Sequence, residues 1–181
     1  MITTRGFTFN GHHSSEFNVY MKPDSRVLIP ELRKSAITVP GRSGSYYQND
    51  GAYNARTENI TCWYTRIPGQ TIPEQSRQIA AWLSEEGTLI FDNEPDKYYI
   101  ATFSGAPSLS QHQSYGEFSL TFTYSPPFAF SEQRSHETVI TQQNTDVVIP
   151  VSGTAQTPCR IVIYNGGTST IENITIEHSM I

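Results

Sequence analysis

The chain has 181 residues and a formal net charge of -5, with 36% hydrophobic and 16% charged residues, a composition typical of globular rather than disordered proteins. Its few lysines and arginines do not cluster, which argues against a nucleic-acid partner, because binding to a phosphate backbone needs grouped cations. No stretch approaches the ~20 apolar residues of a membrane span and the amino terminus lacks an apolar signal core, so we expect a soluble protein that starts in the cytoplasm and has no membrane partner.

The first part of the chain predicts β-structure. Its 10 Tyr and 9 Phe suit pleated surfaces, so the expected class is mainly β. Residues 6–11 alternate apolar and polar side chains and end in Asn10-Gly11, a strand followed by a turn. We expect this strand to form a hairpin with a second short strand at residues 17–21. Residues 36–39 are a further possible strand.

Residues 58–65 predict a strong strand. Ile60, Cys62 and Tyr64 share one face of it, and Trp63 lies on the other. The strand should run just before the helix described next.

A helix over residues 72–86 is the clearest element of the sequence. Thr71 and Glu74 form the pattern of a capping box at its start, and apolar residues including Trp82 recur at helical spacing. Gly87 can take positive φ after the last turn and should end the helix. A single amphipathic helix is not stable alone, so Trp82 should pack on a sheet made by the flanking strands.

Beyond the helix, residues 89–91 and 98–103 predict a hairpin whose turn is residues 92–96. Residues 117–124 alternate most regularly, with Phe118 and every second residue after it on one face, and this strand should cover a core.

Consecutive prolines after Ser125 interrupt strand pairing, and we place a domain boundary near Ser131. The first domain is then residues 1–131. Residues 132–181 should form a partial second β domain with short strands at 138–141, 147–149, 160–164 and 171–176. So few residues make a thin core, so this domain is expected to be truncated or completed by another subunit.

No group of residues predicts a catalytic, cofactor or metal site. Cys62 and Cys159 are expected to be reduced thiols, with Cys62 inert inside a sheet. Asp92, Glu94 and Asp96 resemble calcium ligands but lack the twelve-residue ligand pattern, so a solvated hairpin tip is expected. No metal site is expected at the histidines, which lack ligand spacing: His12, His13, His112, His136 and His178.

The loop around Gly41-Arg-Ser-Gly44 has a superficial likeness to phosphate-binding glycine loops. It lacks the spacing and the βαβ context of such loops, so a plain turn is the expected structure.

Several stretches together carry a family resemblance: residues 6–17, the loop 39–46, the strand 56–61, the segment 79–83 followed by 87–91, and the exit Tyr124-Ser-Pro-Pro-Phe128. In order and spacing, over about residues 1–130, they resemble the distal tail proteins (Dit) of long, non-contractile-tailed bacteriophages and their prophages. The sequence after the prolines resembles the entry to that family's second, galectin-like domain.

The resemblance implies a structural protein and not an enzyme. The implied fold is an amino-terminal β-sandwich with one packed helix and a protruding hairpin, followed by the start of a galectin-like β-sandwich. The implied assembly is a six-fold ring, a hexameric hub of the virion tail tip assembled in the bacterial host cytoplasm. Its partners would be further copies of itself, the tail tube protein, a tail-tip or tail-associated protein and a receptor-binding protein.

A ring makes heterologous contacts, so exposed loops are candidates for subunit or partner contact. The candidate loop comprises Pro40, Gly41, Arg42, Ser43, Gly44, Tyr46 and Tyr47. A mere surface loop is the competing interpretation.

Two other functions compete with the tail hub. The many Tyr and Trp residues could stack on sugar rings, which would make the protein a carbohydrate-binding module for host cell-wall glycans. A small hydrolase ranks last, because the sequence assembles no nucleophile, base and acid.

Overall fold

The computed structural model describes residues 6–22, 27, 29–105, 110–111, 115–142, 145–155 and 157–177. The chain divides into two compact units, Met1–His136 (unit 1) and Glu137–Ile181 (unit 2). Pro23-Asp-Ser25, which by its composition is expected to end the strand predicted at residues 17–21, lies outside the described residues.

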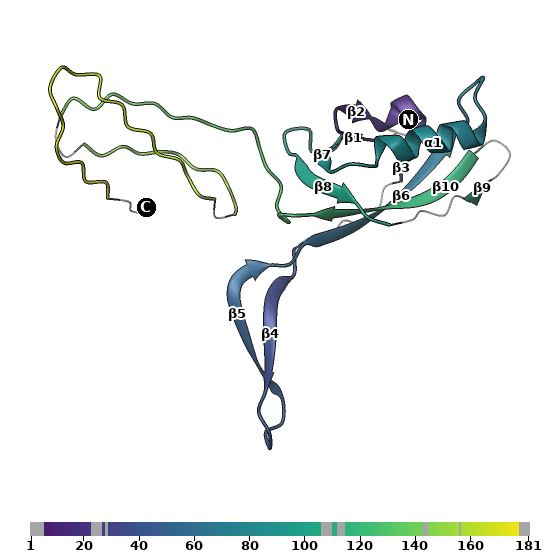
Figure 1. The fold of residues 1–181 in the computed structure, drawn as a ribbon, viewed down its shortest axis with the longest axis horizontal. Coiled ribbons are helices and arrows are strands. Elements are labelled where there is room, and N and C mark those ends of the chain that lie inside the picture. Colours follow the sequence, from purple (N-terminus) through teal and green to yellow (C-terminus); the bar gives the residue numbers. More distant parts are fainter. Residues whose placement is uncertain are drawn as a thin grey trace. The chain divides into compact units, whose positions relative to one another are not determined.

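Unit 1 is built on an antiparallel sheet with the strand order β2-β1-β7-β8-β10-β6-β3, to which β9 is added at β10 (Figure 1). Its strands are β1 (Phe7–Phe9), β2 (His12–His13), β3 (Val19–Met21), β6 (Arg56–Thr65), β7 (Gly87–Phe91), β8 (Tyr99–Phe103), β9 (Ser110–Gln111) and β10 (Tyr115–Tyr124). A second sheet pairs β4 (Leu32–Thr38) with β5 (Ser45–Tyr53). The only helices in the described part of the chain are the 3-10 turn η1 (Ser14–Phe17) and α1 (Ile72–Trp82). The prediction of a mainly β fold with one helix is confirmed.

The two longest strands, β6 and β10, pair along their full length and form one wall of the core. Register places Phe118 opposite Cys62 and Leu120 opposite Ile60, so aligned side chains fall on the same face. All four are buried. The alternation predicted for both strands is confirmed.

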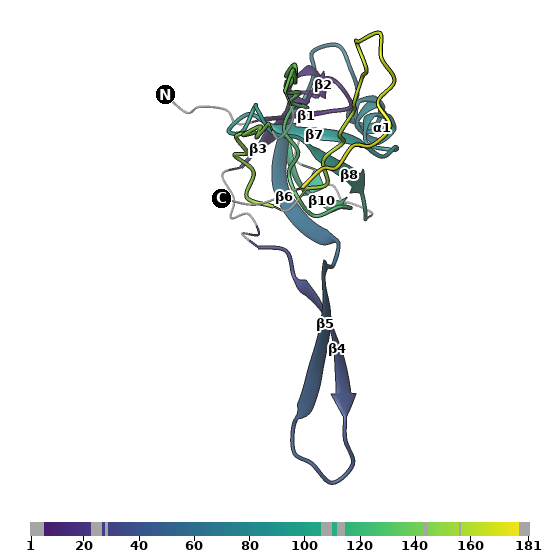
Figure 2. The same ribbon diagram turned by 90° about the vertical axis from the view of Figure 1, so that its left-hand side faces the viewer.

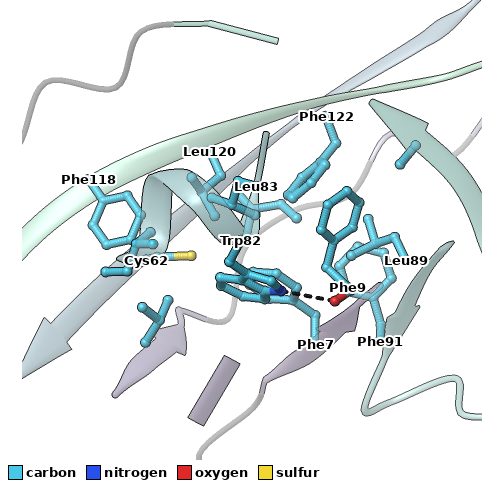
Figure 3. Close-up of a cluster of buried hydrophobic side chains, with 14 of the residues drawn as sticks. Phe7, Phe9, Cys62, Trp82, Leu83, Leu89, Phe91, Phe118, Leu120 and Phe122 are labelled. Atoms are coloured by element: carbon cyan, nitrogen blue, oxygen red, sulfur yellow. Dashed lines mark hydrogen bonds between the residues drawn. The ribbon is translucent and has the colours of Figure 1, made fainter. Parts of the chain in front are cut away.

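The core of unit 1 gathers around Trp82 of α1 (Figure 3). Its indole stacks between Phe7 at 5.4 Å and Phe17 at 4.5 Å between ring centroids. Nε1 donates a hydrogen bond of 2.9 Å to the carbonyl oxygen of Phe9. The expected packing of the tryptophan against the sheet is confirmed. The acceptor of its buried N–H lies in β1, 73 residues earlier in the sequence.

The start of α1 follows the prediction, but its end does not. The Glu74 carboxylate accepts hydrogen bonds from the Thr71 backbone N–H at 2.8 Å and from the Thr71 hydroxyl at 2.7 Å, which ties the first turn. The helix ends at Trp82, not at residue 86, and the Ser84 hydroxyl donates to the carbonyl of Ala81 just beyond it. Acidic residues follow at 85 and 86, where the partial negative charge of a helix end disfavours them.

Gly87 has a different role from the predicted one. It is the first residue of β7 and has no positive φ. A Cβ added there would lie 1.5 Å from Oδ1 of Asn10, so the absence of a side chain allows the turn after β1 to approach β7.

The amino-terminal hairpin forms with a different partner from the predicted one. Asn10 and Gly11 make a two-residue turn in which both have positive φ, and β1 pairs through it with β2. The strand predicted at residues 17–21 begins as η1 and continues as β3, which pairs with β6.

The sheet of β4 and β5 forms a hairpin that extends away from the main sheet of unit 1 in both views (Figures 1 and 2). Every side chain in it is exposed except Leu32 and Ala52, which are half-buried. Residues 36–38 of the possible strand at 36–39 form the end of β4, and β5 was not predicted from the residue pattern.

After β10 the chain is attached at two points to earlier segments. Phe128 packs edge-on against Tyr53 at the base of the hairpin, with ring centroids 5.2 Å apart. Phe130 forms a bridge with Tyr98 through two backbone hydrogen bonds of 2.9 and 2.8 Å, and their rings stack at 5.5 Å. Residues 125–130, which make both contacts, are called the exit segment below.

Unit 2 has no strand among its described residues, so the short strands predicted there are not formed in this single chain. Its β-branched and aromatic side chains are exposed, Val139 to 83% and Tyr164 to 88%. An extended segment needs both a ladder partner and an apolar surface to cover, and these residues have neither.

Candidate functional site

The predicted contact loop, residues 40–47, lies at the tip of the β4–β5 hairpin. The Arg42 N–H donates to the Val39 carbonyl at 3.2 Å, and Gly41 and Gly44 have positive φ. The loop is a turn between two strands, as the plain-turn interpretation expects, and it does not lead into a helix as a phosphate-binding glycine loop does.

The tip combines exposed apolar side chains with one arginine. Ile37 pairs with Tyr46 across the two strands, and Val39 follows on the same face. The guanidinium carbon of Arg42 lies 4.4 Å from the centroid of the Tyr46 ring, and the arginine also hydrogen-bonds the tyrosine hydroxyl. Tyr47 projects from the opposite face and is 69% exposed.

The middle of the hairpin carries a paired charge. Arg33 forms a salt bridge with Asp50, and the hydrogen bond from Arg33 lowers the pKa of that carboxyl below its ordinary value. The Ala52 N–H also donates to Asp50, at 3.0 Å. Arg42 differs from Arg33, because no carboxylate pairs with it among the described residues.

A second surface feature lies where α1 meets the amino-terminal segment. This helix hollow of about 490 Å³ is lined by Asn10, His12 and Phe17 on one side and by Gln78, Ala81, Trp82 and Glu85 on the other. The stacked rings of Phe17 and Trp82 supply its apolar part. The His12 ring nitrogen Nδ1 lies 3.0 Å from Glu16 at the edge.

A buried ion pair lies at the start of β6, just after the β4–β5 hairpin. Glu58 is 2% exposed, and its carboxylate accepts hydrogen bonds from Arg56 at 3.1 Å and from the Tyr124 hydroxyl at 2.9 Å. The Arg56 guanidinium lies over the rings of Tyr124 and Tyr99, 5.5 and 5.8 Å from their centroids. This pair was not predicted from the sequence, although Glu58 lies on the same face of β6 as the buried Ile60 and Cys62.

The cysteines are as expected from the sequence. Neither forms a disulfide, Cys62 is buried and Cys159 is exposed. Burial raises the pKa of the Cys62 thiol to about 12, so no reactive thiolate forms there near neutral pH.

The histidines and acids lie in small separate contacts. His13 Nε2 lies 3.1 Å from Asp92, whose other oxygen accepts from the Gly6 N–H at 2.7 Å. Asp96 pairs with Lys97 at the predicted hairpin tip. Within the described part of the chain no three His, Cys, Asp or Glu side chains gather to hold a metal ion. His136 is exposed, and His112 and His178 lie outside the described residues.

The two surface features thus offer binding geometry, an exposed arginine-bearing tip and a shallow aromatic hollow. Neither brings together a nucleophile, a base and an acid. In the described residues no helix has the length and apolar character needed to cross a membrane.

Comparison with known proteins gives a family and a fold. Residues 13–124 match the family of the phage tail protein RIFT-related domain. A search of curated proteins gives no match. Among solved structures, the chain is similar to the SPP1 Dit protein (gp 19.1), described as a paradigm of the hub adsorption apparatus in phages that infect Gram-positive bacteria.

The similarity to SPP1 Dit has a TM-score of 0.58 at 12% sequence identity and covers 72% of this chain and 53% of the SPP1 protein. At this identity the similarity concerns the fold, and the match spans about half the length of its relative. It agrees with the resemblance to distal tail proteins, which is confirmed. Because the family match covers more than half of the sequence, this chain belongs to the phage tail proteins with a RIFT-related domain.

Proposed function

We propose that this protein is a structural component of the phage tail tip, where six copies form a ring that serves as a hub. The ring would join the tail tube protein to tail-tip or tail-associated proteins and to receptor-binding proteins, after assembly in the cytoplasm of the host. The observation that carries the proposal is the family match, which makes the chain a tail protein, together with a fold shared with a hub protein.

The β4–β5 hairpin supports an assembly role. Its two strands pair only with each other among the described residues, so both outer edges keep unpaired backbone groups. Exposed edges and exposed tyrosines are costly on a monomer and are suited to contact with other chains. We assign the loop Pro40–Tyr47 to such a subunit or partner contact.

Unit 2 supports a further contact. Residues 132–181 are proposed as part of a galectin-like β domain whose sheet forms only with additional strands. Their exposed Val and Ile side chains, including Val148 and Val162, would then be buried.

A measurement of the oligomeric state tests the proposal directly. Purified protein at increasing concentration is measured by light scattering coupled to size exclusion, with negative-stain images of each peak, alone and with the tail tube protein. Closed rings with the mass of six chains are expected. Protein that stays monomeric in both samples contradicts the ring.

Carbohydrate binding is the second candidate, and the observation that favours it is the exposure of Tyr47 and Tyr164. A glycan array with host wall polysaccharides tests it. Binding that is lost in Tyr47→Ala or Tyr164→Ala supports this function, and silence across the array contradicts it.

A further inference from the structure

The helix hollow combines an aromatic floor with a carboxylate at its rim. Its floor is aromatic, since Phe17 and Trp82 stack there, and the indole N–H is already bonded to Phe9. A guest therefore meets apolar ring edges at the floor and finds its polar partners only at the rim.

The rim carries uncompensated negative charge. Glu85 lines the hollow and no cation pairs with it in the described part of the chain. It follows the carboxyl end of α1, whose last turn holds no basic residue, so the partial negative charge of the helix end adds to that of Glu85. His12, the one basic group among the lining residues, is already bonded to Glu16.

The hairpin tip of the same chain offers the complementary chemistry. Arg42 is exposed, lies over Tyr46 and pairs with no described carboxylate, and the apolar Val39 lies beside it. A guanidinium reaching the rim would satisfy Glu85, while the arginine stem covers the ring edges of Phe17 and Trp82.

We propose that the helix hollow binds Arg42 at the hairpin tip of a neighbouring copy of this chain. The two patches differ, so the contact is heterologous, and repetition of such a contact closes a ring when the rotation between neighbours allows it. This inference rests on the proposed ring and names the contact that holds it.

Charge reversal tests the pairing. Arg42→Glu or Glu85→Arg places like charges at the contact, which should raise the concentration for half assembly about tenfold or more. The combined variant restores opposite charges and should assemble within about threefold of the unaltered protein. Lys34→Glu makes the same charge change in the middle of the hairpin and should leave assembly unchanged. Far-UV circular dichroism confirms that each variant is folded.

A cross-link tests the geometry independently of ring formation. Two proteins, each with one exposed cysteine besides the buried Cys62, are mixed under mild oxidation, one with Ser43→Cys and one with Gln78→Cys, both with Cys159→Ser. The mixture should form a disulfide heterodimer, and replacing the first protein by a Lys34→Cys variant should not.

The outcomes separate this inference from the proposed function. Rings that form equally in both charge-reversed variants, with no 43–78 cross-link, overturn the inference and leave the ring standing. A cross-link together with monomeric protein supports the contact and contradicts the ring. In a third outcome the single charge reversals weaken the rings, but the combined variant does not restore assembly and no 43–78 cross-link forms. This outcome assigns Arg42 and Glu85 to other partners and overturns the pairing.

Discussion

Removing the indole of Trp82 should be among the most destabilising single changes in unit 1. Trp82→Ala deletes a ring that stacks on Phe7 and Phe17 and donates to the Phe9 carbonyl. It also removes the largest side chain by which α1 packs on the sheet, and a helix of 11 residues depends on such packing because it does not hold its structure alone.

The size of the effect follows from the contacts. Replacing a buried large aromatic side chain by alanine costs about 3–5 kcal/mol, part of which is the carbonyl left without its donor. A domain of this size is stable by about 5–15 kcal/mol, so the loss is a large fraction of the total. With a urea slope of about 2 kcal/mol per molar, the unfolding midpoint should fall by about 2 M.

Urea unfolding followed by far-UV circular dichroism measures this effect without relying on tryptophan emission. Trp63→Ala is the matched control, because Trp63 lies half-buried on the other face of β6 and contacts one ring, Tyr20, at 4.6 Å. The control should cost about 1 kcal/mol. Equal losses in the two variants would refute the central place given to Trp82.

Three further predictions follow from the buried and capping groups. Glu58→Ala leaves Arg56 buried without its partner and should lower the free energy of unfolding in urea by about 3–5 kcal/mol. A loss below about 1 kcal/mol, which is typical of an exposed site, would contradict the burial of the pair. Ellman's reagent should titrate one thiol, Cys159, in native protein near pH 8 and two in denaturant, because burial raises the pKa of Cys62 to about 12; two fast thiols in native protein would count against this packing. Hydrogen bonds from Thr71 lower the pKa of Glu74 below 4.5, so the stabilisation of the fold by the Glu74 carboxylate is present above that pH and is lost as pH falls through the lowered value. Glu74→Gln should therefore flatten part of the decline in melting temperature between about pH 5 and pH 2. An unchanged decline would disprove this contribution.

The sequence predicted those elements whose signal is local. The capping pattern of Thr71 and Glu74 places the helix start, and strict alternation places β6 and β10, because every second side chain must face the same core. The end of α1 was predicted wrongly because Gly87 looked like a helix stop. Its lack of a side chain instead reflects the close approach of Asn10, which lies far away in sequence.

Elements held by long-range pairing were missed. The strand β5 contains Gln48, Asn49, Asp50 and Gly51, a composition typical of turns, and it is extended because β4 pairs with it. The burial of Glu58 was missed because a carboxylate is exceptional on a buried face, and one of its two partners, Tyr124, lies 66 residues away in sequence.

The helix hollow also depends on tertiary structure. Phe17 and Trp82 come together only when η1 packs on α1, so no spacing in the sequence indicates it. In unit 2 the error is the opposite one, because its Val- and Ile-rich segments predicted strands, whereas its described residues form no strand and their side chains are exposed.

The exit segment determines how tension along the polypeptide would reach the body of unit 1. A pull applied beyond Phe130 meets the two hydrogen bonds and the ring stack with Tyr98 before it meets the long ladder of β10 with β6. That bridge is short enough to peel open and re-form while the core stays folded. A pull from downstream would therefore be expected to open the contacts between Tyr98 and Phe130 first, while the core around Trp82 stays packed.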